Sequence, residues 1–478
     1  MNYRMIFYTL GWVLNIEAAA MLLPLICALI YGDAGFWALL ISIVICLTFG
    51  VSLTFNAPAN KIMYAKEGFI TVSLSWITLS IFGSFPFVIS GYIPNFIDAL
   101  FETISGFSTT GASILTDVES LPKSLLFWRS FTHWIGGMGV LVFLISILPL
   151  SGGGNLHLIR AESTGPAVSK LVPKVKTTAG ILYTIYLCMT IIETVFLLCG
   201  GMGLFDALTT SFGTAGTGGF GIKNSSMADY SPYLQNVVTV FMMLFGVNFT
   251  LYYLILCGKI KSVLKSQELR AYLGIILFAI VIIAFNCHHL FSDLGETLRH
   301  SAFQVVSIIT TTGFMSTDFD KWPELSKAIL VLLMFIGACA GSTGGGIKVS
   351  RILVLLKSIV KEIKISAQPK STHKITIDNR LVEHETVRSI NVFIVSYFVI
   401  LMASVLLISV DNFDFTTNVT AVISAINNIG PGLAGVGPTQ NFSAYSEFSK
   451  IILSIDMLIG RLEIFPILLL LSPHTWKR

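Results

Sequence analysis

The sequence predicts an all-α polytopic membrane protein, with four pseudo-repeated helix–pore loop–helix units around a central pore and two extra N-terminal transmembrane helices. Three observations support this fold class: an apolar composition, a series of membrane-length apolar segments, and a Thr/Gly-rich loop that recurs four times. Hydrophobic residues make up 54% of the 478 positions and charged residues 12%. Soluble globular chains carry about 25% charged residues, so the composition argues against a soluble fold.

Long apolar segments follow one another along almost the whole chain. Most reach the ~20 residues that cross ~30 Å of hydrocarbon. The first follows a single early charge, Arg4, and another apolar segment comes directly after it, so we interpret it as a retained helix rather than a cleaved signal peptide. The segments lie near residues 5–30, 36–57, 68–92, 125–149, 178–200, 234–258, 270–290, 325–340, 347–360, 388–410 and 447–472.

Lys and Arg residues are concentrated in alternate loops, which the positive-inside rule assigns to the cytoplasm. These basic loops are 58–67, 151–177, 259–270 and 348–388. The loops that then lie outside are 93–124, 201–233, 291–324 and 411–446. We therefore expect a multi-pass protein of the cell (inner) membrane with both termini cytoplasmic. The net charge of +4 is too small to indicate nucleic-acid binding.

The four outside segments share one design. Each has a short, mildly apolar stretch, too short to span and typical of a re-entrant segment, followed by Thr/Gly-rich sequence. Alignment on Gly111, Gly219, Gly313 and Gly430 shows a repeat of about one hundred residues, and Ser105, Ser307 and Ser424 then coincide, each six residues before its glycine. The predicted units are 1–60 (two N-terminal helices), 61–152, 153–262, 263–365 (with an intramembrane loop) and 366–478.

These loops carry the chemistry of a potassium selectivity filter. Rings of backbone carbonyls replace the water shell of a potassium ion, and glycine allows the φ values that point carbonyls one way. The residues that we expect at the filter, and hence as the potassium-binding metal site, are Thr110, Gly111, Gly218, Gly219, Thr312, Gly313, Ile429 and Gly430. One such loop alone would more simply be a tight turn, but four in register on one side indicate a filter.

Carboxylates are missing from the filter segments, whereas a calcium-type site would need an acidic ring. Asp98 and Asp206 stand thirteen residues before their glycines, at the far ends of the short helices. We expect them to be N-terminal helix caps rather than ion ligands.

The segment from Gly341 to Gly346 breaks an apolar helix in mid-membrane, where irregular backbone is tolerated only if it is buried in protein or lines a cavity. We predict a mobile plug below the filter, and a close-packed helix break is the alternative. The run to Lys348 loosely resembles a phosphate-binding loop, but Val349 follows the lysine, so we do not expect a nucleotide there. The predicted gate consists of Gly341, Ser342, Thr343, Gly344, Gly345, Gly346, Lys348 and Arg461.

Arg461 lies well inside the last apolar segment, where a charge is costly and should face a pore or a partner. It is either a cationic barrier on the ion path or half of a structural ion pair with Glu463 or Asp456.

Other functional classes have less support. The seven cysteines lie singly, mostly as small core hydrophobes, and form no CxxC or Cys/His cluster. No nucleophile–base pair indicates an enzyme. A sodium- or proton-coupled carrier remains the rival class, and it should show inverted repeats and carboxylates at the membrane midplane.

Together the loops resemble the Trk/Ktr/HKT superfamily of potassium transporters, and the bacterial Trk membrane subunits of the TrkH family in particular. The resemblance covers nearly the whole chain. It is carried by Phe127–Arg129, Trp134–Gly139, Ala340–Val349, Asn427–Leu433 and Met457–Glu463, together with the two leading helices.

The resemblance implies potassium uptake, a homodimer, and a cytosolic TrkA-type regulatory partner. It implies that nucleotide binds the partner and that this chain needs no cofactor of its own. It also makes the 341–346 loop and Arg461 the gate elements. Gly111 matches potassium-selective members, whereas the second filter is richer in glycine than the family pattern, which weakens the expected selectivity at that quadrant.

Overall fold

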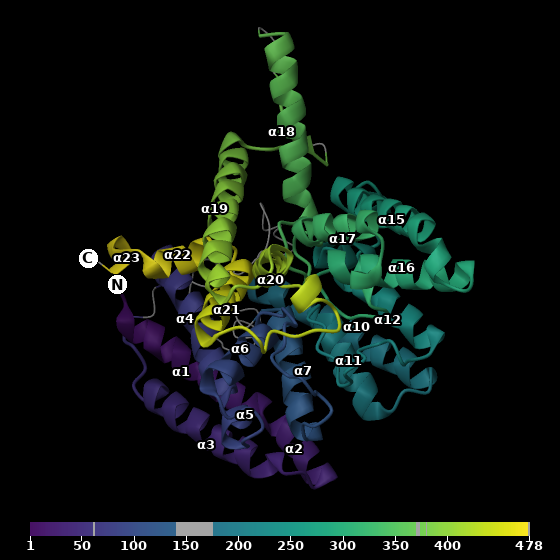
Figure 1. The fold of residues 1–478 in the computed structure, drawn as a ribbon. Helices are drawn as coiled ribbons and strands as arrows, with labels where there is room; N and C mark the ends of the chain where they lie inside the picture. The colour runs from purple at the N-terminus through teal and green to yellow at the C-terminus, as the bar shows by residue number, and fades with distance from the viewer. Residues whose placement is uncertain (61–62, 140–174, 370–372, 379, 477–478) are drawn as a thin grey trace.

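The computed structural model describes residues 1–60, 63–139, 175–369, 373–378 and 380–476 (Figure 1). Helices dominate this part of the chain, which confirms the predicted helical architecture, and a small antiparallel pair of strands, β1 (Thr376–Ile377) and β2 (Arg380–Leu381), lies between two long helices. The predicted boundary at 152–153 and most of the basic segment 151–177 lie outside the described residues.

The N-terminal helices pack against each other through small residues. They are α1 (Tyr3–Ala20), α2 (Leu22–Tyr31) and α3 (Gly35–Thr54). A Cβ at Gly11 of α1 would lie 2.8 Å from the Gly50 carbonyl oxygen of α3, so glycine permits the close approach of the two helices. The far sides of these helices expose large apolar side chains such as Leu29 and Trp37, as expected of a surface that faces lipid.

The remaining helices repeat a long helix, a short buried helix and a second helix, and the last three of these second helices are interrupted. The long helices, with the short α5 that extends the first of them, are α4 (Ala65–Gly83), α5 (Phe85–Ile89), α10 (Val175–Cys199), α15 (Gln267–Cys287) and α19 (His384–Ile408). The short buried helices are α6 (Phe96–Phe107), α11 (Leu204–Gly216), α16 (Leu294–Ile309) and α20 (Phe415–Asn427). The second helices are α7 (Lys123–Gly137), after which the described residues end at 139, and the interrupted helices α12–α13 (Pro232–Phe245 and Phe249–Leu256), α17–α18 (Glu324–Ile336 and Val349–Ala367) and α21–α22 (Glu447–Arg461 and Phe465–Leu471).

Short elements complete the chain: α14 (Ile260–Leu264), α23 (Pro473–Trp476) and the 3₁₀ turns η1 (His288–Leu290), η2 (Phe319–Lys321), η3 (Ser409–Asp411) and η4 (Ala434–Val436). The predicted unit boundary at 262–263 falls inside α14, and the boundary at 365–366 falls inside the last turn of α18. The division of the chain into four such units stays a prediction.

Fewer helices than expected are long enough to cross a membrane unbroken. Six described helical segments reach that length and hydropathy, and a seventh is the pair α12 and α13, which is bent by 90°. The sequence predicts one broken span, at 341–346, but α7, α12, α17 and α21 all end after 13 to 15 residues. The physical reason is that the C-terminal ends of these helices are buried, where other parts of the protein can satisfy their freed polar groups.

The two ends of the chain lie close together. Leu470 near the C-terminus packs against a cluster of Ile6, Leu10 and Ile70, and Figure 1 marks both termini beside α1 and α22–α23. In the same view α18 and α19 project away from the rest of the molecule. The short helices α6, α11, α16 and α20 lie in the interior between these extremes, and most of their residues are buried.

Candidate ion pathway

The four short helices end in loops with one shared backbone conformation. Gly111, Gly219, Gly313 and Gly430 all have positive φ, of 81°, 74°, 81° and 99°. Two residues earlier, Thr109, Thr217, Thr311 and Asn428 have φ between 54° and 58°. Left-handed conformations are rare for residues with a side chain, so the fourfold recurrence is a specific feature of these loops.

One hydrogen bond recurs in each loop and fixes this conformation. The amide of the residue before each glycine donates to the carbonyl oxygen five residues upstream. The bonds run from Thr110 to Ser105 (2.9 Å), Gly218 to Gly213 (2.9 Å), Thr312 to Ser307 (2.8 Å) and Ile429 to Ser424 (3.0 Å). The serines that the repeat alignment singled out are therefore acceptors at three of the four loop bases.

The loops meet in a closed circuit. A Cβ at Gly111 would overlap the carbonyl oxygen of Gly218, and one at Gly219 would overlap that of Thr312. Likewise, a Cβ at Gly313 would overlap the carbonyl oxygen of Ile429. A Cβ at Gly430 would lie 2.9 Å from the carbonyl oxygen of Thr110, which returns to the first loop. All eight predicted filter residues thus come together, each glycine beside a carbonyl of the next loop.

A cavity of about 170 Å³ opens onto this circuit, and all four glycines line it. None of the described residues that line the cavity carries a carboxylate, whereas Arg129 and Lys223 contribute positive charge. The described lining of this cavity therefore offers a cation neutral oxygens and no carboxylate.

The helix ends favour a cation at the same place. Since α6, α11, α16 and α20 all reach the circuit at their C-termini, the partly negative ends of four helix dipoles converge on it.

The hydroxyl groups of the circuit are less symmetric than its backbone. The Thr110 hydroxyl bonds to that of Ser108 at 2.7 Å, and the Thr312 hydroxyl bonds to that of Thr310 at 2.8 Å. The matching residues of the second and fourth loops, Gly218 and Ile429, have no hydroxyl. Asn428 closes the circuit instead, because its amide nitrogen donates to the Thr110 hydroxyl at 2.9 Å and to the Met457 carbonyl at 2.9 Å.

The expected helix-cap role of Asp98 and Asp206 is wrong in detail. Asn95 caps α6, and Asp98 sits in the first turn, where it pairs with Lys450 at 2.6 Å. Asp206 sits in the first turn of α11 and accepts a hydrogen bond of 3.0 Å from the Tyr230 hydroxyl. Both carboxylates stand at the helix end away from the circuit, so neither is an ion ligand.

A buried ion pair that was not predicted from the sequence lies in the wall of this cavity. Arg129 of α7 pairs with Glu102 of α6 at 2.6 Å and also donates to the Gly221 carbonyl at 2.9 Å. Glu102 accepts bonds from the Ser113 hydroxyl and the Ile114 amide. The pair therefore ties the first loop to the second. A charged residue inside the apolar run after the first loop was the only sequence signal.

The break at 337–348 lies directly under the circuit. The Gly345 amide donates to the Thr311 hydroxyl at 2.6 Å, and a Cβ at Gly345 would overlap the Asn427 carbonyl oxygen. A Cβ at Gly344 would lie 2.9 Å from the Thr310 carbonyl oxygen. We call residues 337–348 the intramembrane loop. It packs against the C-terminal ends of both α16 and α20.

Other contacts hold the intramembrane loop on its far side. The Cys339 amide donates to the Gly246 carbonyl at 3.0 Å, and the Phe249 amide donates to the Gly341 carbonyl at 3.0 Å. Thr343 donates to the Phe245 carbonyl at 3.3 Å, and the Lys348 ammonium group donates to the Gly344 carbonyl. Ser342 and Gly346 complete the predicted gate sequence within the same loop. The loop's polar groups thus make contacts within the protein, unlike the open amides of a phosphate-binding loop.

Arg461, at the end of α21, joins the intramembrane loop to α7. Its guanidinium group donates to the Thr343 carbonyl at 2.8 Å, to the Gly137 carbonyl at 3.0 Å and to the Gly136 carbonyl. The carboxylates that the sequence offered as partners are engaged elsewhere. Glu463 pairs with Arg351 at 2.5 Å, and Asp456 accepts from Ser404 at 2.8 Å. The geometry therefore favours a charge beside the intramembrane loop over an ion pair with either carboxylate.

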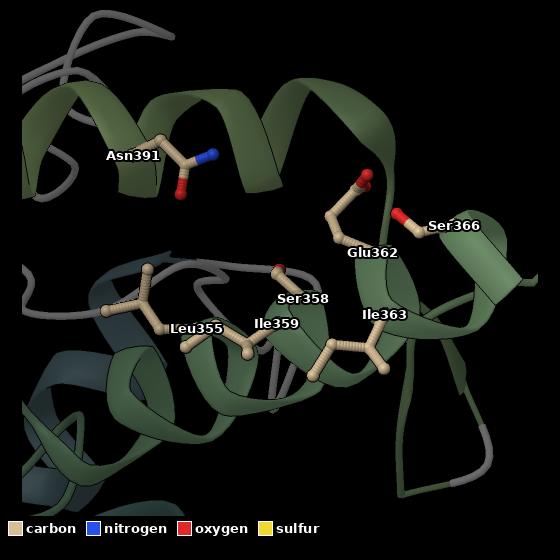
Figure 2. A pocket seen from close by; sticks show the side chains of 7 residues that line it. All are labelled: Leu355, Ser358, Ile359, Glu362, Ile363, Ser366 and Asn391. Atoms are coloured by element: carbon tan, nitrogen blue, oxygen red, sulfur yellow. The ribbon is translucent and has the colours of Figure 1, made fainter.

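A larger hollow, of about 570 Å³, lies between α18 and α19. Figure 2 shows Asn391 of α19 on one side of this hollow and apolar side chains of α18 on the other. The residues that line it are Leu355, Ser358, Ile359, Glu362, Ile363, Ser366 and Asn391. It shares no lining residue with the cavity at the circuit and was not anticipated from the sequence.

A bundle of apolar helices that aims four buried helix ends at a circuit of backbone carbonyls defines a membrane cation transport protein. A family model named TrkH and described as a cation transport protein matches residues 37–477. This chain belongs to that family and is a transporter, not an enzyme.

Relatives match it end to end. The Trk system potassium uptake protein TrkH of Salmonella typhimurium is 35% identical over 485 residues and is covered, like this chain, to 100%. The Trk system potassium uptake protein TrkG of Escherichia coli is 33% identical, and the alignment covers 100% of this chain and 99% of that relative. The crystal structure of the potassium transporter TrkH from Vibrio parahaemolyticus superimposes with a TM-score of 0.90, at 32% identity and 100% coverage of both chains.

Proposed function

We propose that this chain takes up potassium ions across the cell (inner) membrane through the circuit of four loops. The observation that carries the proposal is the circuit itself, in which each positive-φ glycine lies against a carbonyl oxygen of the next loop. Carbonyl oxygens replace the hydration shell of potassium without adding fixed charge. The relatives named as potassium uptake proteins support the choice of ion.

Ion flux into proteoliposomes that contain only the purified chain tests this function. Potassium and sodium are supplied separately and together, and flux is normalised to correctly folded protein. Faster potassium entry that excess sodium does not abolish is expected. Equal permeability to the two ions would overturn the potassium assignment.

A carrier driven by a proton gradient is the second candidate, and one observation favours it. Glu17 of α1 and Glu193 of α10 are buried inside long apolar helices, with exposed fractions of 2% and 0%. Buried carboxylates at membrane depth often mark proton pathways. In a carrier, potassium flux would follow an imposed pH gradient and would lose this response in Glu193→Gln. For a passive pore, we expect flux that depends on the potassium gradient and voltage alone.

The gate in this proposal consists of the intramembrane loop and Arg461. The loop lies against the helix ends below the circuit, and a run of small residues has little helix-forming tendency to hold it in one arrangement. Displacement of the loop would open the path below the filter. The positive charge of Arg461 beside Thr343 would add an electrostatic barrier to an entering cation.

Control of this gate is assigned to a cytosolic TrkA-type protein, with nucleotide bound to that partner. On the projecting helix α18, Lys361 and Lys364 offer a basic surface, whereas the Lys357 ammonium group donates to the Gln267 side chain and the Thr376 carbonyl. Anionic lipid is the competing occupant of such a surface. Co-purification from the native host is the test. Full nucleotide-responsive gating by the chain alone would exclude a regulatory partner.

We further propose that two copies form a homodimer through the projecting pair of helices α18 and α19. Along α18, Leu356, Ile359, Val360 and Ile363 are all at least half exposed, and Figure 2 shows Ile359 and Ile363 at the hollow between the two helices. A helix that projects from the body with an apolar face needs a cover. The mass of the detergent-solubilised particle is expected to fall to that of a monomer in Ile359→Glu. A monomeric wild-type particle would leave lipid as the cover.

A further inference from the structure

Two segments, one at the end of the intramembrane loop and one beside it, have backbone conformations that non-glycine residues rarely adopt. Lys348, just before α18, has φ 83° and ψ 137°. Glu463 and Ile464, just after α21, have φ 58° and 69°. The Phe465 amide donates to the Glu463 carbonyl at 2.8 Å, which closes a three-residue turn around Ile464. A β-branched residue at positive φ is a genuine outlier, and such strain persists only where surrounding contacts enforce it.

One ion pair connects the two strained segments. Arg351, in the first turn of α18, pairs with Glu463 at a distance of 2.5 Å between Nη2 and Oε2. Arg351 also donates to the Ile347 carbonyl at 3.3 Å, and its guanidinium carbon lies 4.2 Å from the centre of the Phe393 ring. The pair thus bridges the end of the intramembrane loop to the turn that immediately follows Arg461.

A second contact joins the end of α21 to the intramembrane loop, beside the Arg351–Glu463 pair. Arg461 donates to the Thr343 carbonyl at 2.8 Å, so the end of α21 contacts the intramembrane loop both at Arg461 and through Glu463. If the Arg351–Glu463 pair separates, the strained turn that holds Arg461 in place loses its outer support.

We propose that Arg351 and Glu463 form a latch that positions Arg461 against the intramembrane loop, and that the strain at Lys348 and Ile464 favours release of the loop once the latch opens. This inference rests on the proposed role of the loop as a gate. Arg351 and Glu463 are positioning residues in it, since neither touches the circuit of filter carbonyls.

The pair has features that distinguish a latch from a purely stabilising contact. The Glu463 side chain is 20% exposed, although its Oε1 atom is buried. The other oxygen of its carboxylate, Oε1, has no hydrogen-bond partner among the described residues. An incompletely satisfied carboxylate and a strained turn both raise the free energy of the arrangement seen here, so an alternative arrangement lies closer in energy.

Cys339 provides a readout of loop release that does not depend on ion flux. It lies in the intramembrane loop with an exposed fraction of 0%. In a background where the other cysteines are replaced by serine, N-ethylmaleimide is expected to label Cys339 about tenfold faster in Glu463→Gln and in Arg351→Gln, which corresponds to ~1.4 kcal/mol. The double variant Arg351→Glu/Glu463→Arg restores the pair with reversed charges and is expected to return labelling to the wild-type rate.

The matched control breaks a different ion pair of the same repeat. Lys327 and Glu324 pair at 2.6 Å on α17, where the Glu324 side chain is 90% exposed. Glu324→Gln is expected to leave Cys339 labelling unchanged. Wild-type labelling rates in Glu463→Gln and Arg351→Gln, or single-variant rates that the charge reversal fails to correct, would overturn the latch.

The strain is tested by two replacements of Ile464, which is buried with an exposed fraction of 1%. Ile464→Ala and Ile464→Gly remove nearly the same packing, but only glycine adopts positive φ without strain. If strain drives release, Cys339 is labelled several-fold more slowly in the glycine variant than in the alanine variant. Equal labelling of the two variants would remove strain from the account.

Potassium flux measured on the same variants separates this inference from the proposed function. Faster labelling together with faster flux supports both. Faster labelling in vesicles that pass no potassium would keep the latch and reject the potassium pathway. Faster flux with unchanged labelling would keep the pathway and reject the latch. Size-exclusion profiles restrict each comparison to folded protein, so poor folding of one variant cannot imitate either result.

Discussion

The four loops of the circuit are alike in conformation, whereas the layer beneath them, made of the second helices and the intramembrane loop, is not. In the loops, four glycines of positive φ and four equivalent amide–carbonyl bonds of 2.8 to 3.0 Å repeat one conformation. In the layer beneath, the second helices of the last three predicted units are interrupted in three different ways. The α12–α13 pair bends by 90°, residues 337–348 form a long loop, and α21 ends in a strained turn around Ile464.

This difference separates two tasks. Selection among similar cations needs equivalent oxygens on every side of the ion, so the loops must be alike. Obstruction of a path needs only one or two elements that can move, so the layer beneath is free to differ. On this account, changes in the loops alter which ion passes, and changes in the layer beneath alter how much passes.

The largest effect is expected at Gly219. In Gly219→Ser the side chain would overlap the Thr312 carbonyl oxygen, and serine would also be strained at a φ of 74°. We expect the potassium preference, or transport itself, to be lost while the protein still inserts in the membrane. Competition between potassium and sodium in the flux assay measures the change.

The control for this substitution is another glycine with positive φ. Gly201→Ser introduces the same side chain at φ 85°, with no atom within 4 Å of the added Cβ. It is expected to keep the ion preference of the wild type. Equal loss of preference in Gly201→Ser would show that the effect does not depend on the filter circuit.

The next largest effect is expected on stability, at the buried pair of Glu102 and Arg129. Glu102→Gln leaves the Arg129 guanidinium group, 3% exposed, without its counter-charge. Removal of one partner of a buried pair typically costs about 3 to 5 kcal/mol. A clear fall in the unfolding temperature in detergent is the expected result. An unchanged temperature would mean that other groups compensate the charge of Arg129.

Arg461→Ala is expected to raise basal potassium flux without altering the ion preference. Two unit charges ~4 Å apart repel by about 4 kcal/mol at an effective dielectric constant of ~20, an upper figure for a wet pore. A rise of tenfold or more in flux per folded protein follows if only part of this barrier applies. Arg461→Lys, which keeps the charge, is the control and should remain near the wild-type flux. Wild-type or lower flux in folded Arg461→Ala would end the barrier role.

The smallest effect is expected at the outer rim, where Lys450 pairs with Asp98 at 2.6 Å and the Asp98 side chain is 24% exposed. Lys450 itself is buried, but the partly exposed Asp98 carboxylate leaves this pair more hydrated than the pair of Glu102 and Arg129. Asp98→Asn should therefore lower the unfolding temperature less than Glu102→Gln does and leave flux and ion preference unchanged. A marked change in ion preference would instead make Asp98 part of the ion path.

The sequence predicts the loops better than the layer beneath them, for a physical reason. A positive-φ glycine constrains the residue type, so Gly111, Gly219, Gly313 and Gly430 remain visible as a repeat. The asymmetric contacts of Arg461 with Thr343 and Gly137 depend on packing between distant units, which leaves no periodic signal. The Arg129–Glu102 pair was missed because its members are 27 residues apart and no local pattern links one to the other.

Helix breaks show the same limit. The break at 341–346 is visible because several glycines follow one another, whereas the bend between Phe245 and Phe249 contains a single glycine, Gly246. Near the end of α21 the breaking residues are Gly460 and Pro466, which lies in the first turn of α22, but the turn itself is at Ile464, a residue type that disfavours it. Tertiary contacts override local preference there, and such contacts cannot be derived from one sequence.

The claim that the four loops form one potassium site is tested most directly by locating the ion. Crystals grown or soaked in rubidium or thallium, which substitute for potassium and scatter anomalously, would show where the cation binds. The account predicts an anomalous peak between the carbonyl oxygens of Thr110, Gly218, Thr312 and Ile429, which lie beside the glycines of the neighbouring loops. A circuit without a peak, together with a peak at a buried carboxylate such as Glu193, would contradict it.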